Sequence, residues 1–283
     1  MDIELLRTFI EVSRTGHFGK AANNLFITQS AVSARIKLLE NTVGVPLFDR
    51  VRNNIQLTPA GRRLALYAEG IVHMWNRALQ QVAVSDDSDV FLSVGGVPAL
   101  WDILLEEWLE RVCRSEPRIV LHADVYGPET QLRMLRDGSL DLGFMFEIPN
   151  AEGLRTAPVA RIPLVLVSSE PRLSVDEALG DGYILVDWGT SFMSFHARNF
   201  SEMVPPGIRV GLGRLAHALL RHQGGAAYLA EPMVMEDLRG NRLFVVQDAP
   251  SMERHAYAVY TEDNDRRGTV EAAIHLAVLP DAN

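Results

Sequence analysis

The segment "AANNLFITQSAVSARIKLLE" (residues 21–40) constrains the fold most, because it describes two helices separated by a short turn. Ala21, Ala22 and Leu25 give a brief first helix whose small inward residues let another helix cross closely. The turn "FIT" follows, and its Thr28 offers a hydroxyl that can cap the next helix. The pattern predicts a helix-turn-helix.

The second of these helices has two faces. At about 100° per residue, Val32, Ile36 and Leu39 gather on one side. The opposite arc holds short or polar residues: Gln29, Ser30, Ser33, Lys37 and Glu40. Arg35 falls on the apolar side, so we expect its stem to follow the surface and its head to reach outward. Such an arc suits entry into a major groove, and the alternative is an ordinary helix with a solvated face.

A first helix and a hairpin flank this motif. Apolar residues recur at helical spacing from Ile3 to Ile10, and Gly16 offers a stop. Two short strands, Leu47–Phe48 and Ile55–Leu57, surround a turn at residues 52–54. The tip therefore presents Arg50, Arg52 and Asn53 to phosphates or a minor groove, with a solvated basic turn as the alternative.

Charge is distributed unevenly along the chain. The 283 residues carry a formal net charge of −9, which would disfavour a nucleic-acid partner if it were spread evenly. Residues 1–63 instead hold nine Lys or Arg against five Asp or Glu, and so carry +4, whereas residues 64–283 carry −13. This asymmetry indicates one segment that approaches a polyanion and another with a different task.

The N-terminal segment resembles the winged helix-turn-helix of LysR-type transcriptional regulators. The match runs through "TQSAVS", "LLE", "PLFDR" and "LTPAG" in the order that the family shows. The resemblance implies that Gln29, Ser30 and Ser33 face the groove, with Thr28 and the hairpin arginines toward the backbone. The full set of expected DNA-binding residues is Thr28, Gln29, Ser30, Ser33, Arg35, Lys37, Arg50, Arg52 and Asn53.

Within that family the chain is most similar to the HdfR group, the repressors of the flagellar master operon. The shared stretches are "HFGKAA", "RNNIQLT", "PALWDILLEEWL" and "YAVYTEDND".

A long amphipathic helix follows the hairpin. Thr58 and Pro59 form an N-cap and a first-turn proline. A heptad seam then appears, made of Leu64, Ala68, Ile71, Trp75, Ala78 and Val82. We expect the seam to pair with a second copy, as the family's linker helix does, and burial within the chain is the alternative. In such a dimer, two DNA-binding domains related by a two-fold axis would read half-sites in successive turns of the duplex.

From Val90 onward, apolar runs alternate with helical patterns, which predicts a parallel sheet covered on both faces. Two such units, joined by "RIPLVLV" and a returning strand near Ala256–Tyr260, predict two lobes with a cleft between them. The resemblance implies the family's α/β effector domain, which has the architecture of periplasmic binding proteins. The expected domains are a winged helix-turn-helix (1–58), a linker helix (59–84) and an effector domain (85–283), with lobe I at about 90–160 and 262–283 and lobe II at about 165–258.

Ligands of open α/β sheets bind beyond the carboxyl ends of the strands. That rule nominates these effector-binding residues: Gly96, Val97, Ala99, Tyr126, Gly127, Phe146, Trp188, Thr190 and Gly224. Tyr126, Phe146 and Trp188 would wall an apolar pocket, and plain core or rim packing is the alternative for each.

The strongest enzymatic pattern is Gly211, Gly213 and Ala216, with Glu231 about 20 residues on, as in a dinucleotide fingerprint. The preceding strand is very short and the cleft offers no hydride-transfer partner, so close helix–strand packing is the favoured interpretation. The eight histidines are scattered and no nucleophile elbow occurs. We therefore expect no catalytic residues, no metal and no cofactor.

These patterns together predict a cytoplasmic, homodimeric or homotetrameric regulator. The lone Cys113 fits a reducing compartment, and no stretch approaches the roughly 20 apolar residues of a membrane span. The protein would bind a two-fold DNA site under control of a small-molecule effector, and contact RNA polymerase. Two other classes stay open: an NAD-binding enzyme fused to a DNA head, and a ligand-independent architectural DNA protein.

Overall fold

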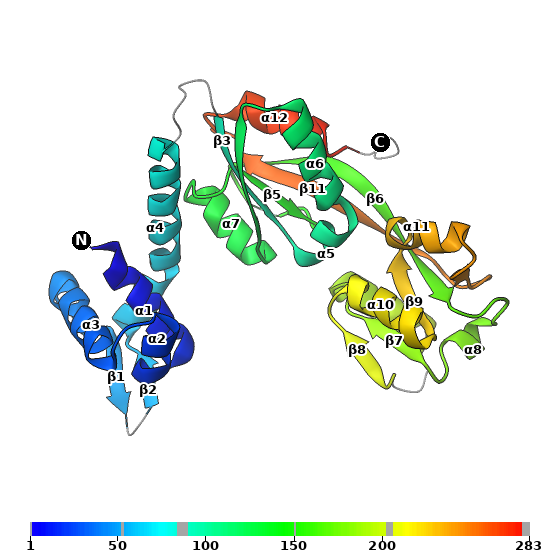
Figure 1. Cartoon of the computed structure of the whole chain (residues 1–283), viewed down its shortest axis with the longest axis horizontal. Coiled ribbons are helices and arrows are strands. Elements are labelled where there is room, and N and C mark those ends of the chain that lie inside the picture. The colour runs from blue at the N-terminus through cyan, green and yellow to red at the C-terminus, as the bar shows by residue number, and fades with distance from the viewer. Residues whose placement is uncertain (1, 52–53, 84–89, 150, 202–205, 279–283) are drawn as a thin grey trace. The chain divides into compact units, whose positions relative to one another are not determined.

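Figure 1 shows the computed structural model of the chain, which describes residues 2–51, 54–83, 90–149, 151–201 and 206–278. The chain forms two compact units: an N-terminal unit of residues 1–87, to which residues 137–139 also belong, and a C-terminal unit of the remainder. Arg52 and Asn53, at the expected hairpin tip, lie outside the described residues.

The N-terminal unit is a three-helix head with a hairpin and a long fourth helix. Its elements are α1 (Ile3–Thr15), α2 (Phe18–Asn24), α3 (Gln29–Val43), β1 (Phe48–Val51), β2 (Asn54–Leu57) and α4 (Pro59–Ala83). The two strands pair antiparallel, with Phe48 opposite Leu57. The predicted winged helix-turn-helix is confirmed, and both strands are longer than the sequence indicated.

Capping residues fix where these helices begin and end. Gly16 ends α1 in the left-handed conformation (φ 61°), which glycine adopts without a Cβ clash. The Thr28 hydroxyl oxygen accepts a hydrogen bond from the N–H of Ala31 at 3.2 Å. Thr58 caps α4 in the same way, accepting from the N–H of Gly61 at 2.9 Å. Each cap satisfies an N–H that a helix start leaves unpaired, so the turn before α3 has a defined end.

The apolar side of α3 is packed in the core of the head. Val32, Ile36 and Leu39 are all buried. The rings of Phe9 on α1 and Phe48 on β1 have centroids 5.4 Å apart, which joins the helices to the hairpin. Burial of each such side chain contributes roughly 1.5–3 kcal/mol, so the rotation of α3 is fixed with its polar side outward.

The C-terminal unit is built on one mixed sheet. Its strands are β3 (Val90–Gly96), β4 (Ile119–Val125), β5 (Leu142–Met145), β6 (Leu154–Ser168), β7 (Tyr183–Val186), β8 (Ile208–Val210), β9 (Ala226–Ala230), β10 (Phe244–Val245) and β11 (Met252–Thr261). Its helices are α5 (Pro98–Leu100), the π-helical turn η1 (Trp101–Leu105), α6 (Glu106–Ser115), α7 (Pro128–Arg136), α8 (Val175–Ala178), α9 (Thr190–Asn199), α10 (Gly213–Gln223), α11 (Glu231–Arg239) and α12 (Arg267–His275). Among the described residues of the whole chain, no helix combines the length and apolarity needed to span a membrane.

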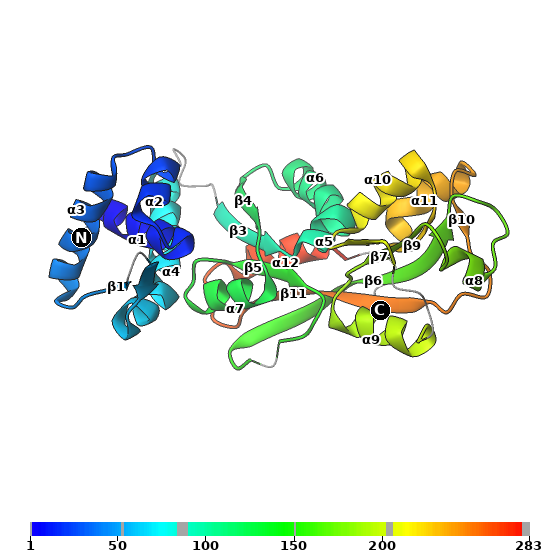
Figure 2. The same ribbon diagram turned by 90° about the horizontal axis from the view of Figure 1, so that it is seen from below.

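Strands β6 and β11 link two lobes. The sheet order is β4-β3-β5-β11-β6-β9-β7-β8, with β10 also on β6. Within lobe I, β3 is parallel to β4 and β5, and within lobe II, β7 is parallel to β8 and β9. Strands β6 and β11 run antiparallel beside each other from one lobe to the other (Figure 2). The predicted parallel strands are therefore found inside each lobe, and the predicted joining and returning strands are β6 and β11.

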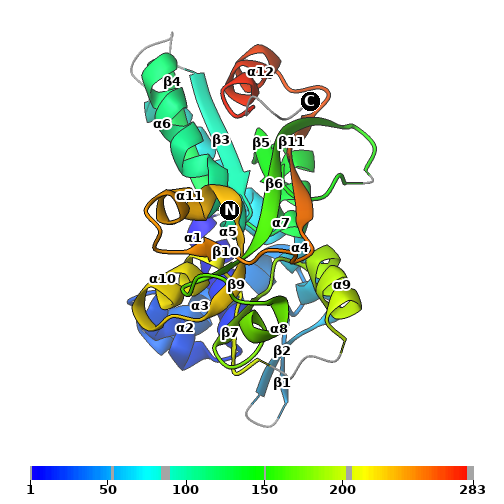
Figure 3. The same ribbon diagram turned by 90° about the vertical axis from the view of Figure 1, so that its right-hand side faces the viewer.

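Helices cover both faces of each lobe. Figures 2 and 3 show α6 and α7 on opposite sides of the lobe I strands, and α9 and α10 on opposite sides of the lobe II strands. Every residue of β5, β7 and β9 is buried as a result. This double cover explains why these strands are near-continuous apolar runs in the sequence.

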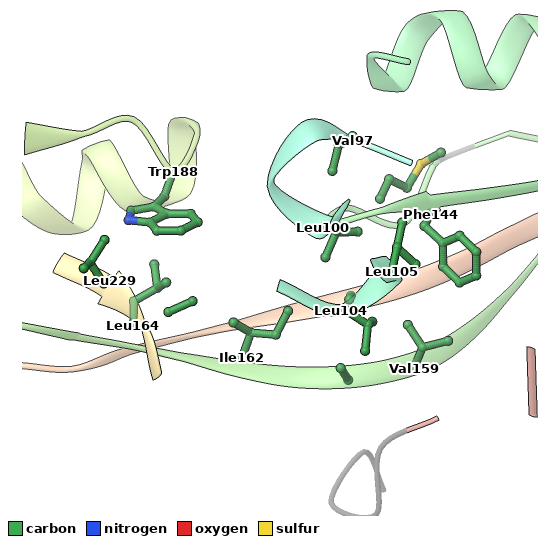
Figure 4. Close-up of a cluster of buried hydrophobic side chains, with 14 of the residues drawn as sticks. Val97, Leu100, Leu104, Leu105, Phe144, Val159, Ile162, Leu164, Trp188 and Leu229 are labelled. Atoms are coloured by element: carbon green, nitrogen blue, oxygen red, sulfur yellow. The ribbon is translucent and has the colours of Figure 1, made fainter. Parts of the chain in front are cut away.

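One apolar cluster extends through both lobes. In Figure 4, Leu100 of lobe I and Trp188 of lobe II lie along the same stretch of β6 that carries Ile162 and Leu164. The side chains between the lobes are therefore part of a shared core, to which the expected effector positions Val97 and Trp188 belong.

Candidate functional site

The outward face of α3 is polar and accessible. Thr28, Gln29, Ser30 and Lys37 are exposed, and Ser33 is half-buried. Hydroxyl and amide groups can donate and accept hydrogen bonds, and a Gln amide can contact an adenine edge through two bonds. The face therefore offers hydrogen-bonding groups on the side of α3 that its own core does not use.

Two charged residues of α3 face the head itself. The Arg35 Nη1 lies 3.3 Å from Glu4 Oε2 and 3.3 Å from the Thr8 hydroxyl, both on α1. The Glu40 Oε1 accepts a hydrogen bond from the N–H of Leu47 at 2.7 Å. The expectations that the Arg35 head reaches outward and that Glu40 belongs to the outward arc are therefore wrong. Both side chains join α3 to neighbouring elements, which helical periodicity alone does not reveal.

The hairpin forms the second part of the candidate interface. Arg50 lies in β1, and its backbone pairs with that of Ile55 in β2. Arg52 and Asn53 lie outside the described residues. Contact of these three residues with DNA stays a prediction.

Phe26 is a surface residue that the sequence analysis did not single out. Its side chain is 95 % exposed, and its φ of 55° is uncommon for a residue other than glycine. The turn is held by hydrogen bonds from the N–H of Phe26 to the Asn23 carbonyl (3.2 Å) and from the N–H of Ile27 to the Ala22 carbonyl (3.0 Å). Strained backbone of this kind concentrates at functional sites, and this one immediately precedes the Thr28 cap.

Helix α4 carries an exposed apolar stripe. Its large members are Leu66, Tyr67, Ile71, Met74, Trp75, Leu79 and Val82. A groove of about 370 Å³ is lined by Ile3, Ile71, Met74, Trp75 and Ala78. Ala68 is fully buried and Leu64 packs on the core of the head, so these two expected seam positions stabilise their own unit. This corrects the predicted seam, because α4 packs against α1 and β2 of its own head.

Most expected effector positions do follow strands at their carboxyl ends. Gly96 is the last residue of β3, and the others are Val97 and Ala99 after β3, Tyr126 and Gly127 after β4, Phe146 after β5, and Trp188 and Thr190 after β7. Their accessibility differs: Val97 and Trp188 are buried, Phe146 is half-buried, and Gly127 and Thr190 are exposed. Effector contact is untested for all of them.

Trp188 is packed as part of the core. Its indole N–H donates to the Tyr228 carbonyl at 2.8 Å. A Cβ added at Gly213 would lie 2.5 Å from the Trp188 ring, so α10 approaches this closely only because glycine stands there. The interpretation of the "GLG" glycines as packing residues is confirmed for Gly213, whereas a Cβ added at Gly211 would meet no atom within 4 Å.

Tyr126 is fixed in the wall of lobe I. Its hydroxyl donates to Asp124 Oδ2 at 3.0 Å, and the Trp101 indole N–H donates to the Asp124 carbonyl at 3.1 Å. Burial and the nearby Asp124 carboxylate raise the pKa of the Tyr126 phenol, so it stays protonated. Tyr126 can therefore serve a ligand as a wall or a hydrogen-bonding group, and not as a base.

Gly224 lies at the other end of lobe II. It follows α10 and precedes β9, at the amino end of that strand. There it lines a separate pocket of about 360 Å³ with Ser169, Glu177 and Asp181 among others. Its assignment to the cleft is wrong, because the strand "AAYLA" begins after Gly224 and does not end at it.

The structure adds Arg254, which the sequence analysis did not nominate. This residue lies on β11 and is 8 % exposed. Its guanidinium carbon is 3.8 Å from the centroid of the Phe146 ring, and its Nη1 donates to the Trp188 carbonyl. Phe146 follows β5 of lobe I and Trp188 follows β7 of lobe II. One cation on a linking strand thus contacts both lobes.

In the part of the chain that the structure describes, no three His, Cys, Asp or Glu side chains form a group able to hold a metal ion. His217 pairs with Asp237, with Nε2 and Oδ2 2.5 Å apart, whereas His222 is exposed. Burial opposes the charged form of Asp237, but hydrogen bonds from Arg242 and His217 lower its pKa below the usual value. This cluster joins α10 to α11 and is structural.

Comparison with known proteins shows that both units match domains of the same family. Residues 3–62 match the family described as "Bacterial regulatory helix-turn-helix protein, lysR family", and residues 91–278 match the "LysR substrate binding domain". The chain is 37% identical over 277 residues to the HTH-type transcriptional regulator HdfR of Yersinia enterocolitica, covering 94% of this chain and 93% of that relative. It is 35% identical over 282 residues to HdfR of Yersinia pestis, covering 95% and 94%.

Solved structures share the fold. CbnR, a LysR family transcriptional regulator, aligns with a TM-score of 0.71 at 17% identity, covering 99% of this chain and 100% of that chain. A full-length OxyR from Pseudomonas aeruginosa aligns with a TM-score of 0.57 at 20% identity, covering 99% and 98%. The relatives are regulators and not enzymes, which removes the NAD-dependent alternative. The chain belongs to the LysR family of DNA-binding transcriptional regulators, with an N-terminal helix-turn-helix domain and a substrate-binding effector domain.

Proposed function

We propose that α3 enters the major groove of duplex DNA and reads base edges through Gln29, Ser30 and Ser33, with Lys37 beside them. The observation that carries this proposal is the orientation of α3: its apolar side is buried in the head and its polar side is exposed. Thr28 and the hairpin residues Arg50, Arg52 and Asn53 then address phosphates or the minor groove. The exposed Phe26 would pack on the sugar–phosphate wall of the groove.

We infer that two copies pair through the exposed part of the α4 stripe. The groove beside Trp75 supports this assembly, because a contiguous apolar surface is costly to leave in water. Two heads on a two-fold axis read half-sites about 34–36 Å apart, so the operator is two-fold as well. A tetramer of two dimers is the other assembly, and analytical ultracentrifugation distinguishes them. A solved neighbour is a complex of CbnR with its target DNA, at a TM-score of 0.69 and 18% identity, which supports the fold alone.

We further propose that a small molecule binds between the lobes and changes the spacing of the DNA heads. A coupling of about 1–3 kcal/mol is typical of such regulation. The functional division is a winged helix-turn-helix (1–58), a linker helix (59–84) and an effector domain (85–283). The regulator acts in the cytoplasm, where its bound form can contact RNA polymerase.

The DNA-binding proposal is tested by selecting genomic DNA fragments with the purified full-length protein. The affinity of two matched variants for the selected fragment is then measured. Gln29→Ala should cost about 1–3 kcal/mol on the selected duplex and relax the preference at one base pair. Lys37→Ala should weaken binding to all sequences and reduce the slope of log affinity against log salt by about one. Unchanged selectivity in Gln29→Ala would contradict the proposed orientation. A ligand-independent architectural protein would instead keep one footprint in the presence of every molecule shown to bind the cleft.

A further inference from the structure

Asp102 is a carboxylate held beside the shared core of the two lobes. It lies in the π-helical turn η1, whose residues Leu104 and Leu105 are buried in that core. The Asp102 side chain is 15% exposed, and its Oδ2 is buried without a hydrogen-bond partner. Single π-helical turns are rare and are frequent at functional positions. A carboxylate oxygen that has lost water and gained no donor is unfavourable, so a small rearrangement around Asp102 would be stabilising.

The cation paired with this carboxylate comes from the other lobe. Arg214 lies in the first turn of α10, and its Nε is 3.7 Å from Asp102 Oδ1. This distance is too long for a hydrogen bond, and the Arg214 side chain is 66% exposed, so it has room to approach. Helix α11 also packs on η1, but none of its charged side chains pairs with Asp102 in the part of the chain that the structure describes. The ion pair therefore joins the two lobes and is only partly formed.

Two changes would relieve the buried charge, and they oppose each other. Burial raises the pKa of the Asp102 carboxyl above its usual value, Arg214 acts against this, and Glu106 of α6 adds to it. The first change is a closer approach of Arg214, whose guanidinium can donate two hydrogen bonds to a carboxylate. The second is uptake of a proton by Asp102, after which the guanidinium is attracted far less. Close approach lowers the pKa of the carboxyl, so by linkage acid favours the separated arrangement.

We propose that Asp102 and Arg214 form a latch between the lobes, which closes when Asp102 is ionised and opens when Asp102 is protonated. At neutral pH the carboxylate draws the start of α10 toward η1, and acid removes this attraction. The latch needs no ligand and so goes beyond the proposed function. Its effect on DNA binding rests on the proposed coupling between the lobes and the DNA-binding domains.

The opening is measured in the full-length protein by pulsed electron resonance between one spin label in each lobe. The first label is attached to the native Cys113, which is exposed on α6, and the second to Ala218→Cys, at an exposed position on α10. Dilution with unlabelled protein limits the measurement to distances within one chain. At constant ionic strength, the mean distance should lengthen as the pH falls from 8 to about 4.5.

Three variants in the labelled protein assign the response. Asp102→Asn keeps the shape of the side chain and should give the long distance at both pH values. Arg214→Gln changes an exposed side chain, which protects folding, and should also give the long distance at both pH values. Glu110→Gln is the matched control, because it breaks an exposed ion pair with Arg114 inside α6 alone. It should respond to pH as the native protein does.

The proposal is overturned by a native distance that does not change with pH, by a pH response that survives in Asp102→Asn, or by a short distance in Arg214→Gln at pH 8. Footprints of native protein and Asp102→Asn on the selected DNA fragment at pH 8 test the regulatory role separately. Equal footprints with different label distances would keep the latch and remove its effect on DNA. Failure of the DNA-binding proposal shows in Gln29→Ala, which lies in the other unit and leaves the latch unchanged.

Discussion

The candidate functional residues of the two units are positioned in different ways. In the N-terminal unit the polar arc of α3 comes from one helix and lies on the surface. In the C-terminal unit the candidate effector positions Phe146 and Trp188 follow β5 and β7, segments far apart in the sequence, and both contact Arg254 of β11. A surface carried by one helix needs only that helix to be oriented, whereas an assembled site needs the packing of the whole unit. DNA contacts and ligand contacts should therefore respond to different substitutions.

The largest expected effect comes from two substitutions in the N-terminal unit. They distinguish a residue that packs the core from a residue that would contact DNA. Phe9→Ala should destabilise the N-terminal unit by about 3–5 kcal/mol, because a buried ring packed against Phe48 is lost. Phe26→Ala removes the same side chain from an exposed site and should change stability by less than about 0.5 kcal/mol, while weakening DNA binding. Urea unfolding and DNA titration of both variants measure the contrast. Equal destabilisation by the two substitutions would show that Phe26 is a packing residue.

The next effect concerns the shared surface of two copies. Trp75→Glu places a carboxylate in the proposed dimer contact, and its burial should cost about 3 kcal/mol or more, raising the dimer dissociation constant by roughly 100-fold. Sedimentation velocity over a concentration series reads this shift. Arg63→Glu, an exposed position in the first part of α4, is the control and should stay dimeric. A native protein that sediments as a monomer would contradict the proposed use of the stripe.

Substitution of two glycines tests whether the position of the Trp188 side chain depends on the close approach of α10. Gly213→Ala should destabilise the C-terminal unit by about 1–3 kcal/mol, because its Cβ would displace the Trp188 ring. Gly211→Ala meets no atom within 4 Å and should be close to neutral. Thermal unfolding compares the two. If Gly213→Ala is as stable as Gly211→Ala, the Trp188 ring can move aside. Its position would then depend less on the packing of α10 than the geometry indicates.

The smallest expected effect is a pH dependence of stability, and it concerns only the C-terminal unit. His196 is buried among aromatic rings, with Nε2 2.8 Å from the Tyr183 hydroxyl, and burial lowers its pKa below 6.5. The unfolded chain then takes up a proton at a higher pH than the folded chain does. Stability should be unaffected above pH about 7 and fall as the pH drops through about 6.5. His196→Gln should reduce the stability difference between pH 8 and pH 5.5, and an unchanged difference would assign the dependence to other groups.

The sequence predicted the head well because its signals are local. The caps at Thr28 and Thr58 and the buried face of α3 follow from residue type and helical period. Arg35 and Glu40 escaped prediction, since their partners come from α1 and the hairpin. Ala68 fits a heptad as well as it fits a core, and only the packing of α4 on its own head distinguishes the two.

The residues around the expected effector site were predicted less completely than those of the N-terminal unit. Strand ends gave most of its positions, but Gly224 was assigned to the wrong end of lobe II, because it precedes the strand "AAYLA" and so lies at the amino end of β9. Arg254 lies in "MERHAYAVY", between Glu253 and His255, and this run of three polar residues gives no sign of burial. Its burial arises only because β5 and β7 place Phe146 and Trp188 around it. Contacts between distant segments have no periodic signature.

Site-specific photocrosslinking tests most directly whether α3 lies in the groove. A photoreactive amino acid replaces Lys37 on the outward face of α3 or, as the control, the exposed Arg14 at the end of α1. On a duplex selected by the protein, the reagent at position 37 should crosslink to bases within the half-sites, and the reagent at position 14 should give none. Base crosslinks from position 14 with none from position 37 would contradict the account.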